Sequence, residues 1–127
     1  MDRSQDERAW FSGLADAFAQ ALVDARACAA ACERLLEAGR ATLAPAEQQR
    51  LLRALVLPAA ISGVLIDLGD RPPLLVLAAA RVCRETSLTA LEQLALLEAP
   101  LDCTAAAGAL RRAADSCGRL LEAVDSR

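Results

Sequence analysis

The chain of 127 residues contains no histidine and no tyrosine, and it has only two phenylalanines and one tryptophan. All of its basic residues are arginines, so lysine is absent as well. Without these residue types, acid–base catalysis would have to depend on carboxylates and thiols alone. Aromatic and β-branched residues, which are typical of strands, are also scarce. We therefore expect a helical protein that is not an enzyme.

The charge and hydropathy patterns argue against nucleic acid and membranes as partners. The net charge is -3, and the arginines are scattered among acidic residues, whereas binding to a phosphate backbone needs clustered positive charge. The most apolar stretch, residues 55–66, is about 12 residues long and includes Pro58 and Gly63, against about 20 apolar residues for a membrane-spanning helix.

The beginning of the sequence points to the cytoplasm. Residues 1–8 are acidic and polar, and no apolar run typical of a secretory signal peptide follows them. In the cytoplasm thiols stay reduced, and clustered cysteines there indicate metal or redox chemistry more often than structural disulfides. The length suits one domain, 1–127, which can bury a core without disulfides or metals.

The abundant residues are hydrophobic, at 55% of the chain, and alanine and leucine dominate them. Both residues head the scale of helix propensity. Cap and turn residues divide the chain into four predicted helices, at about residues 5–38, 46–68, 74–98 and 103–125. Short connections between four helices predict an all-α, antiparallel up-down-up-down four-helix bundle.

The first and last helices have the clearest end signals. Ser4 and Glu7 form a capping box at the start of the first helix, and Gly39 is its predicted stop. The Ser12-Gly13 pair leaves open a break inside this helix. Asp102 is the predicted cap of the fourth helix.

The second predicted helix is apolar on all sides between Arg53 and Asp67, and Pro58 is expected to kink it. Every helix of a bundle this small has an outer face, so an apolar outer face indicates a partner. We predict a homo-oligomer that forms through this helix. The carboxylates beside the core positions, Asp24 among them, are expected on solvated faces with arginine neighbours.

All five cysteines fall on predicted core-facing positions of the first, third and fourth helices. In the fourth helix these positions are Cys103, Ala107, Leu110, Ala114, Cys117, Leu121 and Val124.

Helical geometry groups four of the cysteines into two pairs. Cys28 and Cys32 lie one turn apart on a single helix face. At a rise of about 1.5 Å per residue, Cys83 and Cys117 both lie about 22 Å from the end of the bundle where the first helix finishes. On the same scale Cys28 lies about 15 Å and Cys32 about 9 Å from that end. Cys103 is predicted near the mouth of the bundle.

The thiol pattern favours soft metal chemistry over zinc or iron–sulfur clusters. Zinc sites usually need four ligands with histidine or closely spaced cysteine pairs, and clusters need four thiolates around one point. Thiolates select Cu(I), which a small number of them can hold. Two alternatives remain open: the cysteines are small core residues, or Cys83 and Cys117 form a redox-sensitive disulfide.

The bundle layout and three cysteine-containing segments resemble the bacterial four-helix-bundle copper storage proteins. The segments read Ala-Cys-Ala-Ala-Ala-Cys-Glu, Arg-Val-Cys-Arg-Glu-Thr-Ser and Asp-Cys-Thr-Ala-Ala-Ala-Gly-Ala-Leu-Arg-Arg-Ala-Ala-Asp-Ser-Cys. Proteins of that family line the bundle with Cys-x-x-x-Cys pairs that hold Cu(I), and they assemble as oligomers. The resemblance covers residues 23–124 and implies a similar fold.

The chain departs from the family pattern at three of the four expected pairs. Cys28 and Cys32 form the one complete Cys-x-x-x-Cys. The partner positions of the other cysteines hold Ser87, Ala107 and Leu121. The resemblance therefore implies a Cu(I)-binding bundle with few sites, and the predicted metal ligands are Cys28, Cys32, Cys83 and Cys117. The alternative function is a non-catalytic oligomeric interaction module with inert core cysteines.

Overall fold

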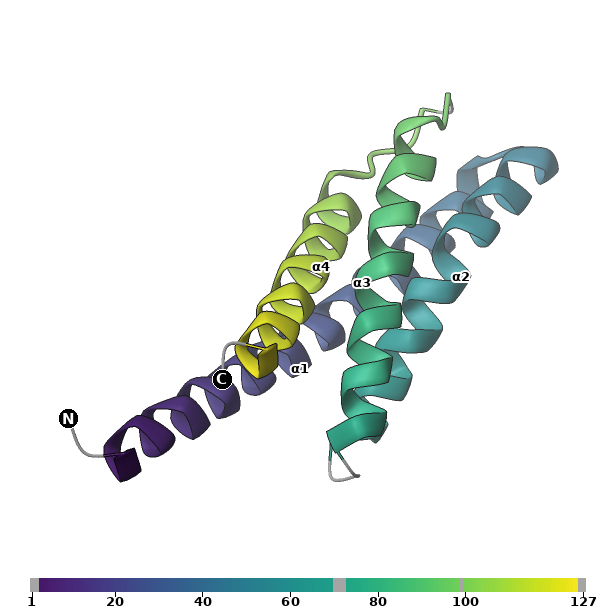
Figure 1. Cartoon of the computed structure of the whole chain (residues 1–127). Helices are drawn as coiled ribbons and strands as arrows, with labels where there is room; N and C mark the ends of the chain where they lie inside the picture. Colours follow the sequence, from purple (N-terminus) through teal and green to yellow (C-terminus); the bar gives the residue numbers. More distant parts are fainter. Residues whose placement is uncertain (1–2, 70–72, 99, 126–127) are drawn as a thin grey trace.

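The computed structural model describes residues 3–69, 73–98 and 100–125. It consists of four helices: α1 (Arg3–Thr42), α2 (Pro45–Asp67), α3 (Pro73–Ala95) and α4 (Thr104–Asp125). Helix α1 packs against α2 and α4, and α3 packs against the same two helices, which closes a ring around the core (Figure 1). The predicted all-α four-helix bundle is thereby confirmed.

Helix α1 is much longer than the other three. It has 40 residues, while α2 and α3 have 23 each, which corresponds to about 60 Å against about 35 Å. Its N-terminal part consequently extends beyond the bundle (Figure 1). The Trp10 indole N–H donates a 2.9 Å hydrogen bond to the carbonyl of Ala123, and this bond ties the extension to the last turns of α4.

The predicted stop of α1 at Gly39 is wrong. The helix continues to Thr42, and no described glycine has a positive φ. Gly39 is buried, and a Cβ atom at this position would lie 2.5 Å from Cδ2 of Leu51. The glycine therefore permits close contact between α1 and α2 and does not end the helix.

The start of α1 also differs from the prediction. The helix begins at Arg3, so Ser4 lies inside its first turn and not before it. The helix is continuous through Ser12 and Gly13.

Helix α3 ends at Ala95, three residues before the predicted end at 98. The backbone N–H groups of Leu96 and Leu97 each donate to the carbonyl three residues earlier, which is the tightened turn common at helix ends. At the start of α4, the Thr104 N–H donates to Asp102 Oδ1 at 3.0 Å. The side chain of Asp102 thus binds the first N–H of the helix as predicted, although α4 begins at Thr104 and Cys103 takes the N-cap position. The Thr104 side chain and then this backbone bond lower the pKa of the Asp102 carboxyl.

The core consists almost entirely of small and medium-sized side chains, and the predicted core positions of α1 and α3 that hold Cys28, Cys32 and Cys83 are buried in it. In α4 the predicted set is partly wrong. Ala107 and Leu121 are only half-buried, and their neighbours Ala106 and Leu120 are buried instead. The run of alanines at the start of α4 carries no polar residue that would have fixed the rotation of the helix.

Pro58 is buried, and α2 continues through it from Pro45 to Asp67.

The outer surface of α2 and α3 carries many large hydrophobic side chains. The exposed hydrophobic residues of the two helices are Leu52, Val56, Leu57, Val64, Leu74, Leu75, Val82 and Leu88. By length and hydropathy alone, α2 also meets the criterion for a membrane-spanning helix, a criterion that apolar core helices of soluble proteins meet as well.

Candidate metal centre

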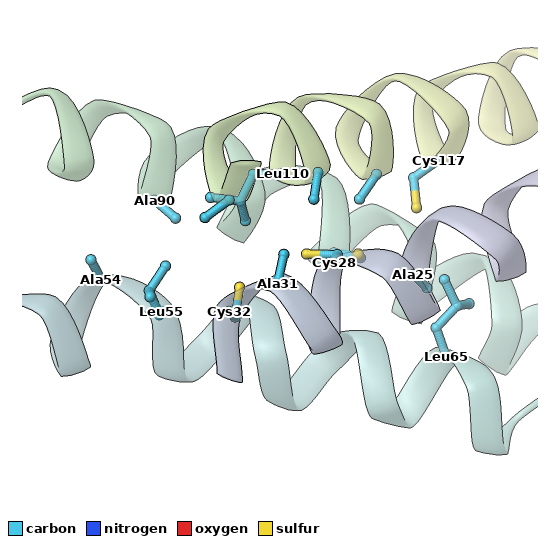
Figure 2. Close-up of a cluster of buried hydrophobic side chains, with 14 of the residues drawn as sticks. Ala25, Cys28, Ala31, Cys32, Ala54, Leu55, Leu65, Ala90, Leu110 and Cys117 are labelled. Carbon is cyan, nitrogen blue, oxygen red and sulfur yellow. The ribbon is translucent and has the colours of Figure 1, made fainter. Parts of the chain in front are cut away.

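Four of the five cysteines lie in the centre of the bundle. Cys28 and Cys32 come from α1, Cys83 from α3 and Cys117 from α4, and each has an exposed fraction of 0%. All four thiols are free. Figure 2 shows the labelled Cys28, Cys32 and Cys117 between the helices, surrounded by alanine and leucine side chains.

Within α1, the Cys28 and Cys32 thiols interact directly. A hydrogen bond from Cys32 is the largest cause that lowers the pKa of Cys28. The same bond, together with burial, raises the pKa of Cys32. One thiol of the pair therefore loses its proton more readily, because the other thiol donates a hydrogen bond to the resulting thiolate.

Cys83 and Cys117 form the second pair, across α3 and α4. A hydrogen bond from Cys117 lowers the pKa of Cys83 to about 7, and the interaction with Cys83 raises the pKa of Cys117. The structure thus brings together both pairs that the spacing predicted. In each pair one thiol has a lowered pKa, and thiolates are the form that binds metals.

Weaker electrostatic effects connect the two pairs. The negative charge of an ionised Cys83 acts against the lowering of the Cys28 pKa and adds to the raised pKa of Cys32, and the charge of Cys28 adds to the raised pKa of Cys117. We call these four buried thiols, which come from three helices, the central group.

Two serines complete this group. Ser62 of α2 and Ser87 of α3 are both fully buried, and their hydroxyls lower the pKa of Cys28 and of Cys83. Ser62 Oγ lies 3.8 Å from Cys83 Sγ. The helical spacing could have identified both serines, because each lies among the core-facing, mostly apolar positions of its helix.

The prediction that Asp24 lies on a solvated face with arginine neighbours is wrong, because Asp24 is buried. Its exposed fraction is 6%, and the Gln20 side-chain amide donates to its Oδ2 at 3.2 Å. It lies one turn before Cys28 on α1, and its charge contributes to the raised pKa of Cys117. Helix geometry explains the burial, because positions 24 and 28 share one face.

Cys103 does not belong to the central group. It is half-buried just before α4, and its thiol donates to the carbonyl of Leu101 at 3.6 Å. Burial and the charge of Asp102 raise its pKa. This placement agrees with its predicted position near the mouth of the bundle.

The ligand geometry limits which metals the group could hold. Within residues 3–69, 73–98 and 100–125, no three or more histidine, cysteine or acidic side chains are arranged to bind one ion. Zinc and iron–sulfur sites usually need four protein ligands. The arrangement instead offers pairs of thiols, together with the fully buried hydroxyl of Ser87, which has no hydrogen-bond partner in the described part of the chain.

No family model, curated protein or solved structure matches the chain in the three comparisons.

Proposed function

We propose that this protein binds Cu(I) through pairs of core thiolates, as a copper storage protein-like bundle with few sites. The ligands are Cys28 with Cys32, and Cys83 with Cys117. The observation that carries the proposal is the pairing of four free, fully buried thiols, with one thiol of lowered pKa in each pair.

Cu(I) suits these pairs better than other metals do. It is a soft ion that thiolates select, whereas carboxylates and water suit harder ions. Binding one Cu(I) between two thiols releases two protons and leaves a bis-thiolate complex with one negative charge. A pair of sulfurs is sufficient for this complex, so the lack of a third ligand in the described part of the chain is no obstacle.

An anaerobic Cu(I) titration against a competing chelator tests the proposal. The wild type is expected to take up Cu(I) tightly, and Cys28→Ala/Cys32→Ala and Cys83→Ala/Cys117→Ala should each lose part of that uptake. Cys103→Ala is the matched control, because its thiol lies outside the central group. Absence of tight uptake by the wild type, or full uptake by both double variants, would refute the proposal.

A second candidate function is an oligomeric interaction module whose core cysteines are inert. The observation that favours it is the exposed apolar surface of α2 and α3, where Leu57 and Leu74 are 62% and 81% exposed. Large exposed apolar patches mark interaction sites, and we propose that copies of the chain associate through α2. Sedimentation at micromolar concentration tests this idea, and a strictly monomeric protein would exclude it.

A further inference from the structure

Among the described residues, Ser87 is the one buried serine whose hydroxyl makes no hydrogen bond. A helical serine or threonine commonly donates its hydroxyl to the backbone carbonyl one turn earlier. Ser116 does this, with Oγ donating to the Arg112 carbonyl at 2.9 Å, and so does Thr86, which donates to Val82 at 2.9 Å. The buried Ser87 Oγ makes no such bond and has no hydrogen-bond partner among the described residues.

The surroundings of Ser87 show what could satisfy its hydroxyl. Ser87 lies one turn after Cys83 on the buried face of α3, and its hydroxyl contributes to the lowered pKa of Cys83 and of Cys28. A neutral thiol is a weak acceptor, whereas hydrogen bonds to an ionised acceptor are about twice as strong as neutral ones. The Ser87 hydroxyl is unsatisfied among the described residues, and it would gain a strong acceptor if a neighbouring sulfur bound a metal ion as a thiolate.

Ser62 approaches the Cys83 sulfur from the neighbouring helix α2. Its Oγ lies 3.8 Å from Cys83 Sγ, and its hydroxyl contributes to the lowered pKa of Cys28. Cys83 thus has one serine one turn later on its own helix and a second serine beside it on α2.

We propose that Ser87 and Ser62 are positioning residues of the metal centre, which donate hydrogen bonds to the Cys28 and Cys83 sulfurs when these bind metal as thiolates. The inference rests on the proposed Cu(I) function and deepens it. Hydrogen bonds to metal ligands orient them and tune the metal.

The charge of the loaded centre explains the need for such donors. Each bis-thiolate Cu(I) complex carries one negative charge in a buried setting, where an uncompensated charge is costly. The chain has no lysine or histidine, and none of the arginines that the structure describes is buried. The Asp24 carboxylate, 6% exposed, adds negative charge. Two neutral hydroxyl donors are therefore the polar groups suited to stabilise the complex.

The test compares Ser87→Ala and Ser62→Ala with Ser116→Ala in the full chain. Ser116 is a matched control, because it is 1% exposed and its hydroxyl already bonds to the backbone. Competitive Cu(I) titration is expected to show a loss of affinity of about 10- to 100-fold for Ser87→Ala, and a smaller loss for Ser62→Ala. The ultraviolet band of the Cu(I)–thiolate bond should shift in both variants and stay unchanged in Ser116→Ala.

Thermal unfolding of the metal-free protein separates a positioning role from a structural one. Removing a poorly satisfied hydroxyl should leave the unfolding midpoint of Ser87→Ala unchanged or higher, although its Cu(I) affinity falls. Ser87→Thr keeps the hydroxyl and should restore most of the affinity. A variant that loses stability and affinity together, with no shift of the band, would overturn the inference.

The outcomes also distinguish this inference from the function on which it rests. If the wild type takes up no Cu(I), the proposed function and the inference both fail. If the wild type binds Cu(I) tightly and Ser87→Ala and Ser62→Ala bind it equally well, only the positioning role fails.

Discussion

Replacing Gly39 by alanine tests whether this residue is a packing glycine of α1. A Cβ atom there would lie 2.5 Å from Leu51 Cδ2 and 3.3 Å from Leu43 Cδ1. Ordinary carbon contacts begin at about 3.5 Å, so the Leu51 methyl would have to move by roughly 1 Å. Leu51 is 1% exposed and has little room for this shift.

Two opposing effects set the size of the change. Overpacking a core costs typically about 1–3 kcal/mol, whereas exchanging glycine for alanine inside a helix gains about 1 kcal/mol in helix propensity. Gly39→Ala should therefore lower the free energy of unfolding by about 0–2 kcal/mol. Gly63→Ala is the matched control, because nothing lies within 4 Å of the Cβ position at Gly63 in α2, and it should gain about 1 kcal/mol.

Chemical denaturation followed by circular dichroism measures the free energy of unfolding of both variants, which should differ by about 1–3 kcal/mol. In thermal unfolding this difference corresponds to roughly 4–11 °C in midpoint for a chain of this size. Equal stabilisation of the protein by Gly39→Ala and Gly63→Ala would show that the close contact of α1 with Leu51 does not exist. In that case the reasoning about Gly39 would be refuted.

Three further predictions concern other parts of the molecule. Maleimide should label Cys103 alone in the native state, because the other four thiols are 0% exposed, and mass spectrometry counts the labels. The labelling rate should keep rising above pH 9, because the pKa of Cys103 is raised from its usual 9.0. Trp10→Phe removes the 2.9 Å bond to the Ala123 carbonyl, which should cost about 1 kcal/mol and speed proteolysis within the N-terminal extension of α1; unchanged cleavage would contradict this. Val64→Asp places a charge on the outer face of α2, where Val64 is 44% exposed. Light scattering should show that this variant dissociates an oligomer, while the unfolding midpoint of the monomer changes little. An intact oligomer would exclude α2 as the interface.

The number of helices and their approximate bounds followed from composition and turn residues, because alanine-rich segments between prolines and glycines have few alternatives to helix. The end of α1 did not follow, since a glycine looks the same in sequence whether it ends a helix or allows another helix to approach. The rotation of α4 was missed for a related reason. Its adjacent alanines fit either register, and only packing against α1 and α3 decides between Ala106 and Ala107.

The candidate site was predictable in part. Helical spacing placed Cys28 beside Cys32, and counting the rise per residue placed Cys83 level with Cys117. The contact of Ser62 with Cys83 could not be predicted, because it depends on how the helices are rotated about their axes. Asp24 was misplaced because charged residues are rarely buried, although its spacing from Cys28 put it on the inner face.

The enclosure of the four thiols has a consequence for kinetics. No sulfur of the central group meets solvent in the closed bundle, so an ion or an oxidant reaches it only while the helices separate briefly. Such local openings have their own free energies, which rise toward the global stability in the middle of a core. The residence time of an ion bound to these thiols would therefore depend on the rate of local opening of the bundle as well as on affinity. Substitutions that tighten helix packing would slow both the binding and the release of the ion.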